Sequence, residues 1–159
     1  MDTNLTAAAP FVREAGAGST LNVLGVTHIY KATAAETGGS FSLWEAVIPP
    51  GAGAPPHTHD HEDESFYVLG GELLIEFDGA PGPHRLGPGG FFFGARGRRH
   101  SFRNGGDQPA RVLILSAPSV GLDRMFAELD AAAATGMPEI GTLAAITAKH
   151  GVTIEPPAA

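Results

Sequence analysis

The segment HTHDHEDE, residues 57–64, places three histidines and four carboxylates within eight positions. Such a run is commonly a solvated charged loop, but imidazoles and carboxylates are also the ligands of divalent transition metals. In an extended strand, residues two positions apart share a face, so His57 and His59 point the same way and Thr58 points away. Two interpretations therefore stay open at this point: an exposed loop or part of a metal site.

The sequence after His59 does not favour a strand, because Asp60 favours a turn and the residues around it have low β-propensity. We expect the chain to reverse over 60–63 and to enter the next strand near Glu64. A carboxylate at the start of that neighbouring strand can face both imidazoles. His61 would join them only if the first strand continued, so we expect it to be a loop residue.

A further ligand must come from another part of the chain, and His100 is the candidate. The segment RRHSFRNGG, residues 98–106, has the pattern of a short strand that ends in an Asn-Gly turn. Three imidazoles and one carboxylate would leave one or two open positions on a five- or six-coordinate metal. Metal catalysts with open sites use this arrangement.

The sequence around these residues is typical of a β-protein. From residue 21 to 116, short apolar or alternating runs are separated by turns rich in Gly, Pro, Asn and Asp. This spacing predicts an antiparallel sandwich or barrel. The 22 glycines and 13 prolines agree with many short strands joined by turns.

The pattern changes after residue 116 to a helical one. Ser119 can cap a helix in which apolar residues recur at helical spacing, before Gly136 and Pro138 end it. A second helix fits residues 139–150, with Gly151 after its end. We therefore predict an N-terminal arm over 1–20, a barrel over 21–118 and a helical tail over 119–159 that packs on the barrel and partly closes its mouth. The apolar positions expected to do so are Leu122, Met125, Phe126 and Leu129.

With these motifs the chain resembles a small single-domain cupin, similar to the bacterial cupins related to quercetin 2,3-dioxygenase. The first family pattern, G-x5-H-x-H-x3–4-E-x6-G, is matched by Gly51, His57, His59, Glu64 and Gly71. The spacing to Gly71 selects the last carboxylate of the segment rather than its neighbours. The resemblance implies an all-β, antiparallel double-stranded β-helix, or jelly-roll barrel, followed here by the two-helix tail.

The second family pattern, G-x5-P-x-G-x2-H-x3-N, is matched by Gly89, Gly97, His100 and Asn104. Ala95 stands where the family has Pro, a change that affects the stiffness of a turn and leaves the ligands intact. The resemblance implies one divalent metal per chain, Fe, Ni, Mn, Co or Zn, held by the two strand histidines, Glu64 and His100. No organic cofactor is expected.

These residues predict an enzyme, and the leading hypothesis is a metal-dependent dioxygenase that acts on an aromatic or enolic small molecule. The resemblance implies that Glu64 is also the general base. A pocket walled by apolar side chains favours such substrates. The side chains expected to form both the barrel core and the pocket are Phe66, Ile75, Phe91, Phe93, Phe102, Met125 and Phe126. The alternatives are a non-redox isomerase, epimerase, lyase or cyclase, and a small-molecule sensor.

Other polar residues receive simpler interpretations. We expect His28, His84 and His150 to be surface residues or histidines with satisfied hydrogen bonds. Arg96, Arg98 and Arg99 could meet an anionic substrate at the mouth, but a solvated turn is the preferred interpretation.

Composition limits the partners. The chain of 159 residues has a net charge of −7, which gives no electrostatic support for nucleic-acid binding. It has no cysteine, which excludes disulfides, thiolate ligands and cysteine nucleophiles. With no signal-like or membrane-spanning stretch in the sequence, we expect a cytoplasmic protein, a homodimer whose other partners are a small-molecule substrate and dioxygen.

Overall fold

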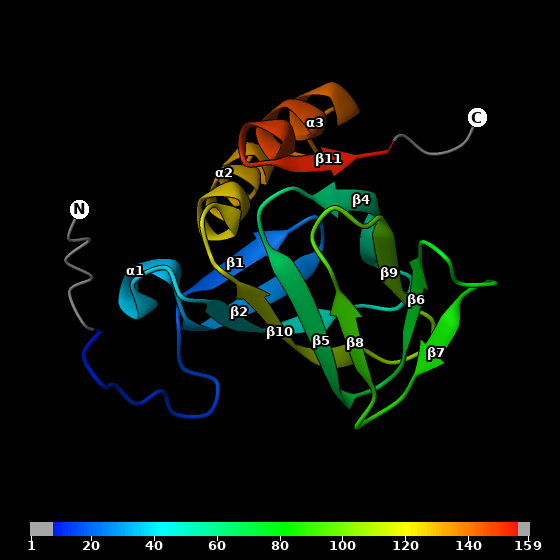
Figure 1. Cartoon of the computed structure of the whole chain (residues 1–159), viewed down its shortest axis with the longest axis horizontal. Helices are drawn as coiled ribbons and strands as arrows, with labels where there is room; N and C mark the ends of the chain where they lie inside the picture. Colours follow the sequence, from blue (N-terminus) through cyan, green and yellow to red (C-terminus); the bar gives the residue numbers. More distant parts are fainter. Residues whose placement is uncertain (1–7, 156–159) are drawn as a thin grey trace.

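The computed structural model describes residues 8–155, and strands make up most of it between residues 20 and 117 (Figure 1). One sheet has the order β1-β2-β3-β10-β5-β8 and the other has the order β11-β4-β9-β6-β7. Every pairing within them is antiparallel. The predicted all-β jelly-roll fold is confirmed. The strands are β1 (Thr20–Val23), β2 (Val26–Ala32), β3 (Ser42–Ile48), β4 (Gly53–His59), β5 (Asp63–Gly70), β6 (Leu73–Phe77), β7 (His84–Leu86), β8 (Phe91–Gly94), β9 (His100–Asn104), β10 (Ala110–Ala117) and β11 (Val152–Ile154).

The core lies between the two sheets and follows from the two-residue alternation of their strands. In β2 and β3, buried and half-buried residues alternate along the whole strand. Trp44, Phe66, Ile75 and Ile114 are among the side chains that this alternation buries completely or almost completely. A sheet that buries one face in this way has a fixed register, because a shift by one residue would expose every core side chain.

The apolar run that begins at Leu21 forms two strands rather than one. Leu24 and Gly25 both have positive φ, 51° and 85°, and join β1 to β2 as a two-residue hairpin turn. Farther on, the short helix α1 (Ala34–Thr37) starts at Thr33, which forms a capping box with Glu36.

The helical tail consists of α2 (Leu122–Ala133) and α3 (Ile140–Lys149), as the sequence predicts. Figure 1 shows both helices at one end of the barrel, above β1 and β4. The third element of the tail, β11, was not expected from the sequence and pairs with β4, so the tail completes one of the two sheets. No helix in the described part of the chain is long and apolar enough to cross a membrane.

The prediction that Ser119 caps the first tail helix is wrong. The helix starts two residues later, with Gly121 at the N-cap position and no side chain of its own capping it. The Ser119 hydroxyl instead lies 2.6 Å from that of Ser42. The proposed division into arm, barrel and tail stays a prediction, and 1–7 and 156–159 lie outside the described residues.

Candidate metal centre

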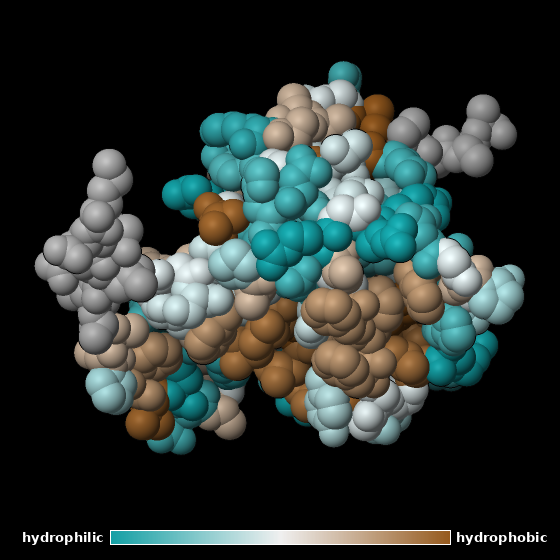
Figure 2. Space-filling model, viewed as in Figure 1, coloured by the Kyte–Doolittle hydropathy of each residue, from teal (hydrophilic) through white to brown (hydrophobic). Residues whose placement is uncertain are grey.

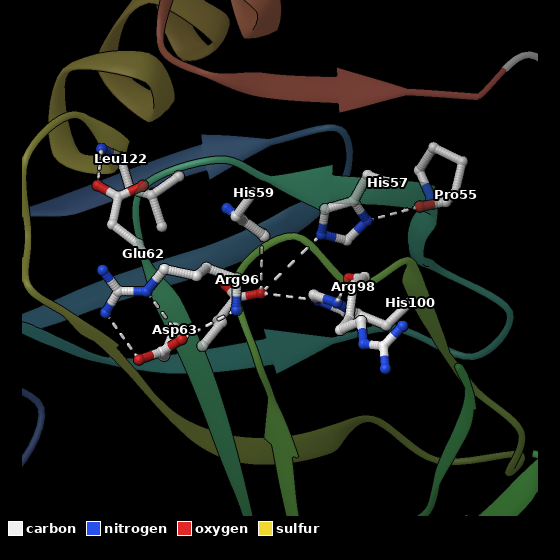
Figure 3. Close-up of polar contacts among 10 residues, drawn as sticks. Pro55, His57, His59, Glu62, Asp63, Arg96, Arg98, His100 and Leu122 are labelled. Atoms are coloured by element: carbon white, nitrogen blue, oxygen red, sulfur yellow. Dashed lines mark hydrogen bonds and ion pairs between the residues drawn. The ribbon is translucent and has the colours of Figure 1, made fainter. Parts of the chain in front are cut away.

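The structure brings together the four residues that the sequence predicts as metal ligands. One ligand atom each from His57, His59, Glu64 and His100 lies within 4.8 Å of all the others. His57 and His59 come from β4, Glu64 from β5 and His100 from β9, so three strands of the two sheets meet here. All four side chains are buried. Figure 3 shows the three imidazoles turned toward one point.

One carboxylate oxygen, Oε2 of Glu64, faces all three rings. It lies 3.2 Å from Nε2 of His100, 3.3 Å from Nε2 of His59 and 3.9 Å from Nε2 of His57. The His59 contact is close but lacks hydrogen-bond geometry, so both ring nitrogens of His59 are buried without a hydrogen-bond partner among the described residues. An unpaired nitrogen in such a cluster is what a metal ligand needs.

The opposite nitrogens of two rings are held by the backbone. Nδ1 of His57 lies 2.8 Å from the carbonyl oxygen of Pro55, and Nδ1 of His100 lies 3.3 Å from that of Arg98. A backbone carbonyl accepts a hydrogen bond from Nδ1–H, which keeps the proton on Nδ1 and leaves the Nε2 lone pair free for a metal. Three nitrogens and one carboxylate fit Fe, Ni, Mn, Co or Zn, and the cluster is therefore a possible metal-binding group.

The electrostatics of the cluster keep Glu64 ionised. Burial acts to raise the pKa of this carboxyl, but the imidazoles of His59, His100 and His57 outweigh burial and hold the pKa well below its usual range. Burial lowers the pKa of His57, so this ring favours the neutral form that binds metals. Burial acts in the same direction on His59, but Glu64 and the nearby Glu62 and Asp60 outweigh it and raise its pKa.

The remaining residues of the segment have other partners. His61 is exposed in the loop between β4 and β5, as expected, and lies against Gly151. A Cβ at Gly151 would come within 2.6 Å of the His61 ring, and the residue has a φ of +74°, so glycine is required there. Asp63 forms an ion pair of 2.8 Å with Arg96 (Figure 3).

Glu62 is the residue of the segment whose role the sequence did not indicate. Its side chain is only 1% exposed, and its Oε1 accepts hydrogen bonds from the backbone N–H groups of Val120, Gly121 and Leu122. These groups form the start of α2, which explains why that helix needs no capping side chain of its own. Glu62 therefore links the start of α2 to the turn between β4 and β5, the strands that hold three of the four cluster residues.

A cavity connects the cluster to the helical tail. Its walls include His57, His59 and Glu64 on one side and Met125, Phe126 and Leu129 of α2 on another. The empty space amounts to about 640 Å³, part of which is open to solvent. The position of α2 over this cavity agrees with the expectation that the tail partly closes the barrel mouth.

Three of the seven predicted pocket residues line this cavity: Phe102, Met125 and Phe126. Phe66 and Ile75 are fully buried in the core and do not line it. The prediction for Phe91 and Phe93 is wrong, because both side chains are exposed, by 61% and 55%.

The error concerns which side chains of β8 face the core. In the FFF run the central residue, Phe92, points inward, and its two neighbours point outward. Together with Tyr67 and Leu69 of β5, these neighbours form an exposed apolar patch on the outer face of the six-stranded sheet. Figure 2 shows apolar surface gathered over this region below the helices.

The three arginines and the histidines outside the cluster lie away from the cavity, with one exception. None of Arg96, Arg98 and Arg99 lines the cavity within the described residues, and Arg99 pairs with Glu155, which agrees with a solvated turn. His84 is exposed, and Nε2 of His150 lies 3.0 Å from Glu128. His28 differs from the expectation, because it is buried and lines the cavity.

Comparison with known proteins agrees with this fold and site. The family model described as "Cupin domain" matches residues 44–116, which contain all four residues of the cluster. Polyketide synthase CurC of Streptomyces cyaneus is 34% identical over 86 residues, which cover 54% of this chain and 53% of CurC. Quercetin 2,3-dioxygenase of Bacillus subtilis is 31% identical over 96 residues, which cover 60% of this chain and 28% of that protein.

Among solved structures, the polyketide cyclase RemF of Streptomyces resistomycificus matches with a TM-score of 0.58. The match covers 70% of this chain and 80% of RemF at 23% identity, and it shows a shared fold. The matches span between 28% and 59% of the length of the curated relatives.

Proposed function

Residues 44–116 of this chain form a cupin domain, and on that premise we propose that the protein is a metal-dependent dioxygenase that acts on an aromatic or enolic small molecule. The observation that carries the proposal is the position of Glu64. Its carboxylate faces three imidazoles and also lines an otherwise largely apolar cavity. A substrate in that cavity therefore meets a metal-binding group and an ionised carboxylate at the same place.

The metal would be held by His57, His59, Glu64 and His100. When bound, a divalent transition metal would supply positive charge that stabilises an enolate oxygen and, if it is redox-active, a route for electrons from the substrate to dioxygen. The resemblance to quercetin 2,3-dioxygenase, 31% identical over 96 residues, supports oxygenation as the reaction.

Glu64 is the proposed general base. Oε2 is the oxygen that faces the three imidazoles, so Oε1 is free to take a proton from a substrate hydroxyl. The low pKa of the carboxyl keeps it ionised at neutral pH, so a substrate meets its unprotonated form. The proton is then held at the buried carboxyl.

The cavity walls would orient the substrate. Trp44, Phe102, Phe126 and Ile114 present flat or branched apolar surfaces to the enclosed space. Such walls favour an aromatic ring and exclude water from the reacting atoms, which strengthens the electrostatic interactions of the Glu64 carboxylate.

A non-redox reaction is the second candidate function. The match to polyketide synthase CurC supports a substrate of the polyketide class, and an isomerase, epimerase, lyase or cyclase would use the same first proton transfer. Both functions need Glu64 and the metal, so the role of dioxygen separates them.

The deciding experiment compares turnover in air and under nitrogen. Protein loaded with one metal at a time is given quercetin and other enolic aromatic compounds, while an oxygen electrode follows dioxygen. Dioxygenation predicts uptake of dioxygen in proportion to product and no turnover under nitrogen. An equal rate without dioxygen, especially with zinc, would exclude the dioxygenase and support the non-redox candidate.

The expected homodimer stays a prediction. We place its interface on the exposed apolar patch of Tyr67, Leu69, Phe91 and Phe93, because contiguous exposed apolar surface is typical of sites where proteins associate.

A further inference from the structure

His28 is a buried polar residue that the proposed reaction does not use. It lies in the middle of β2, between the inward-facing Val26 and Tyr30, and is only 6% exposed. Its ring packs against those of Phe126 and Trp44, with centroid distances of 4.7 and 6.1 Å. Its position on the inner face makes it part of the cavity wall.

Two polar atoms at this place have no hydrogen-bond partner among the described residues: Nδ1 of His28 and Nε1 of Trp44. Buried polar groups in folded proteins are almost always paired, because an unpaired one has lost its hydrogen bonds to water. Both atoms have less than 1 Å² of accessible surface, so a molecule in the cavity would pair with them only after a small rotation of the rings that carry them.

The pair lies three strand positions away from Glu64 along the sheet. His28 is on β2 and Glu64 on β5, and β3 and β10 separate these strands. Three strand spacings amount to at most about 14 Å along the curved sheet. Apolar side chains, including Ile114 and Phe126, line the cavity that holds both groups. A molecule of several linked or fused rings could therefore contact both.

We propose that His28, with Trp44 beside it, forms a second polar subsite that binds a hydroxyl or carbonyl oxygen of the substrate at the part of the cavity away from the metal cluster. The inference rests on the proposed function and narrows its substrate class to aromatic molecules that carry oxygen groups at both ends. One oxygen group lies at Glu64 and the other at His28. His28 is thus a positioning residue that selects the substrate.

The charge state of His28 suits this role. Burial lowers its pKa to about 4, so the ring is neutral near pH 7. A neutral imidazole has one donor and one acceptor nitrogen, and the indole of Trp44 adds a donor. The subsite can therefore bind a phenolic hydroxyl or a carbonyl without a charged partner.

The test uses two flavonols that share the enolic group and differ in the hydroxyls on their other two rings. Quercetin and 3-hydroxyflavone share the enolic 3-hydroxyl and 4-carbonyl groups, but only quercetin carries further ring hydroxyls. Trp44, the single tryptophan of the chain, lines the cavity, so quenching of its fluorescence reports binding directly. Dissociation constants are measured with metal-loaded protein for the wild type, His28→Phe, His28→Gln and the exposed control His84→Gln.

The wild type and His84→Gln should bind quercetin more tightly than 3-hydroxyflavone. His28→Phe should weaken the binding of quercetin about 3- to 10-fold, the size expected for loss of one neutral hydrogen bond. The binding of 3-hydroxyflavone should change little. His28→Gln should restore part of the preference, which loss of packing alone would not explain, and it also serves if the Phe variant does not fold.

Equal weakening of both flavonols, or no weakening of either, would overturn the subsite while leaving the proposed function intact. Failure of both flavonols to bind the wild type would also overturn the proposed subsite. The proposed function has a separate test. It fails if no enolic substrate is turned over with uptake of dioxygen, and this result can occur even when the preference for quercetin depends on His28.

Discussion

Glu62 and Glu64 are the same residue type, two positions apart and almost completely buried, with exposed fractions of 1% and 4%. Their surroundings differ. Glu64 faces three imidazole side chains, whereas Glu62 faces three backbone N–H groups at the start of α2. One carboxylate is part of a possible metal site and the other fixes a helix over the cavity. The comparison teaches that the partners of a buried carboxylate, rather than its position in a motif, decide what it does.

The same division runs through the whole segment. His57, His59 and Glu64 point inward from strands, while 60–62 form the turn between β4 and β5 and contact the tail. Asp60 N–H, for example, donates to the carbonyl of Gly151 at 2.8 Å. The loop thus joins the metal cluster to the elements that cover it.

The largest expected effect separates the inward from the outward histidines. His59→Ala removes a proposed ligand and should reduce metal affinity by more than the roughly 10- to 100-fold that follows loss of a group that merely orients a ligand. His61→Ala should keep full metal content. Elemental analysis after equilibration with each metal is the measurement. Greater metal loss in His61→Ala than in His59→Ala would show that the assignment of the ligands is wrong.

The next effect separates the two glutamates. Glu64→Gln should lower kcat by roughly 100-fold or more, because an amide can still ligate a metal but cannot accept the substrate proton. Metal content should fall much less than kcat. Glu62→Gln, the matched control, should change kcat only a few-fold. Similar kcat values for both variants would remove the general-base role.

His28 is a third buried ionisable group, and its burial makes the stability of the protein depend on pH. Its pKa is about 4 in the folded chain and about 6.5 in the unfolded chain. Between these values the unfolded chain binds a proton that the folded chain does not, so stability falls as pH falls through this window. At pH 5 the contribution amounts to roughly 2 kcal/mol.

Denaturant unfolding of wild type and His28→Phe at pH 7 and pH 5 measures this contribution. The wild type should lose more stability than the variant, and comparing the two cancels the titration of all other groups. Equal losses would mean that His28 does not stay neutral in the folded protein.

The smallest effect concerns the Glu62 contacts. Glu62→Gln keeps an oxygen acceptor but removes the negative charge at the start of α2, and it should destabilise the protein by about 1 kcal/mol. The exposed control Glu76→Gln should stay within about 0.5 kcal/mol of wild type. Amide hydrogen exchange at Val120, Gly121 and Leu122 should become faster in Glu62→Gln alone. Unchanged exchange there would show that the charge does not hold the helix.

Several features could be predicted from the sequence because they depend on local periodicity. The inward direction of His57 and His59 follows from the two-residue alternation of a strand, and α2 and α3 follow from helical spacing. The same alternation indicates one further buried residue in β2. His28 occupies an inward position of β2 between Val26 and Tyr30, and this pattern alone marks it as buried.

By itself, the sequence determined the strand-rich fold, the two helices and the set of residues able to bind a metal, since residue type and spacing are local properties. Only the tertiary structure decided that Phe92 rather than Phe91 or Phe93 points inward, that Glu62 caps α2, and that His28 shares a cavity with Glu64. The physical reason is that these features depend on which strands and helices become neighbours. Burial and hydrogen-bond partners then come from residues far apart in the chain, which no local pattern specifies.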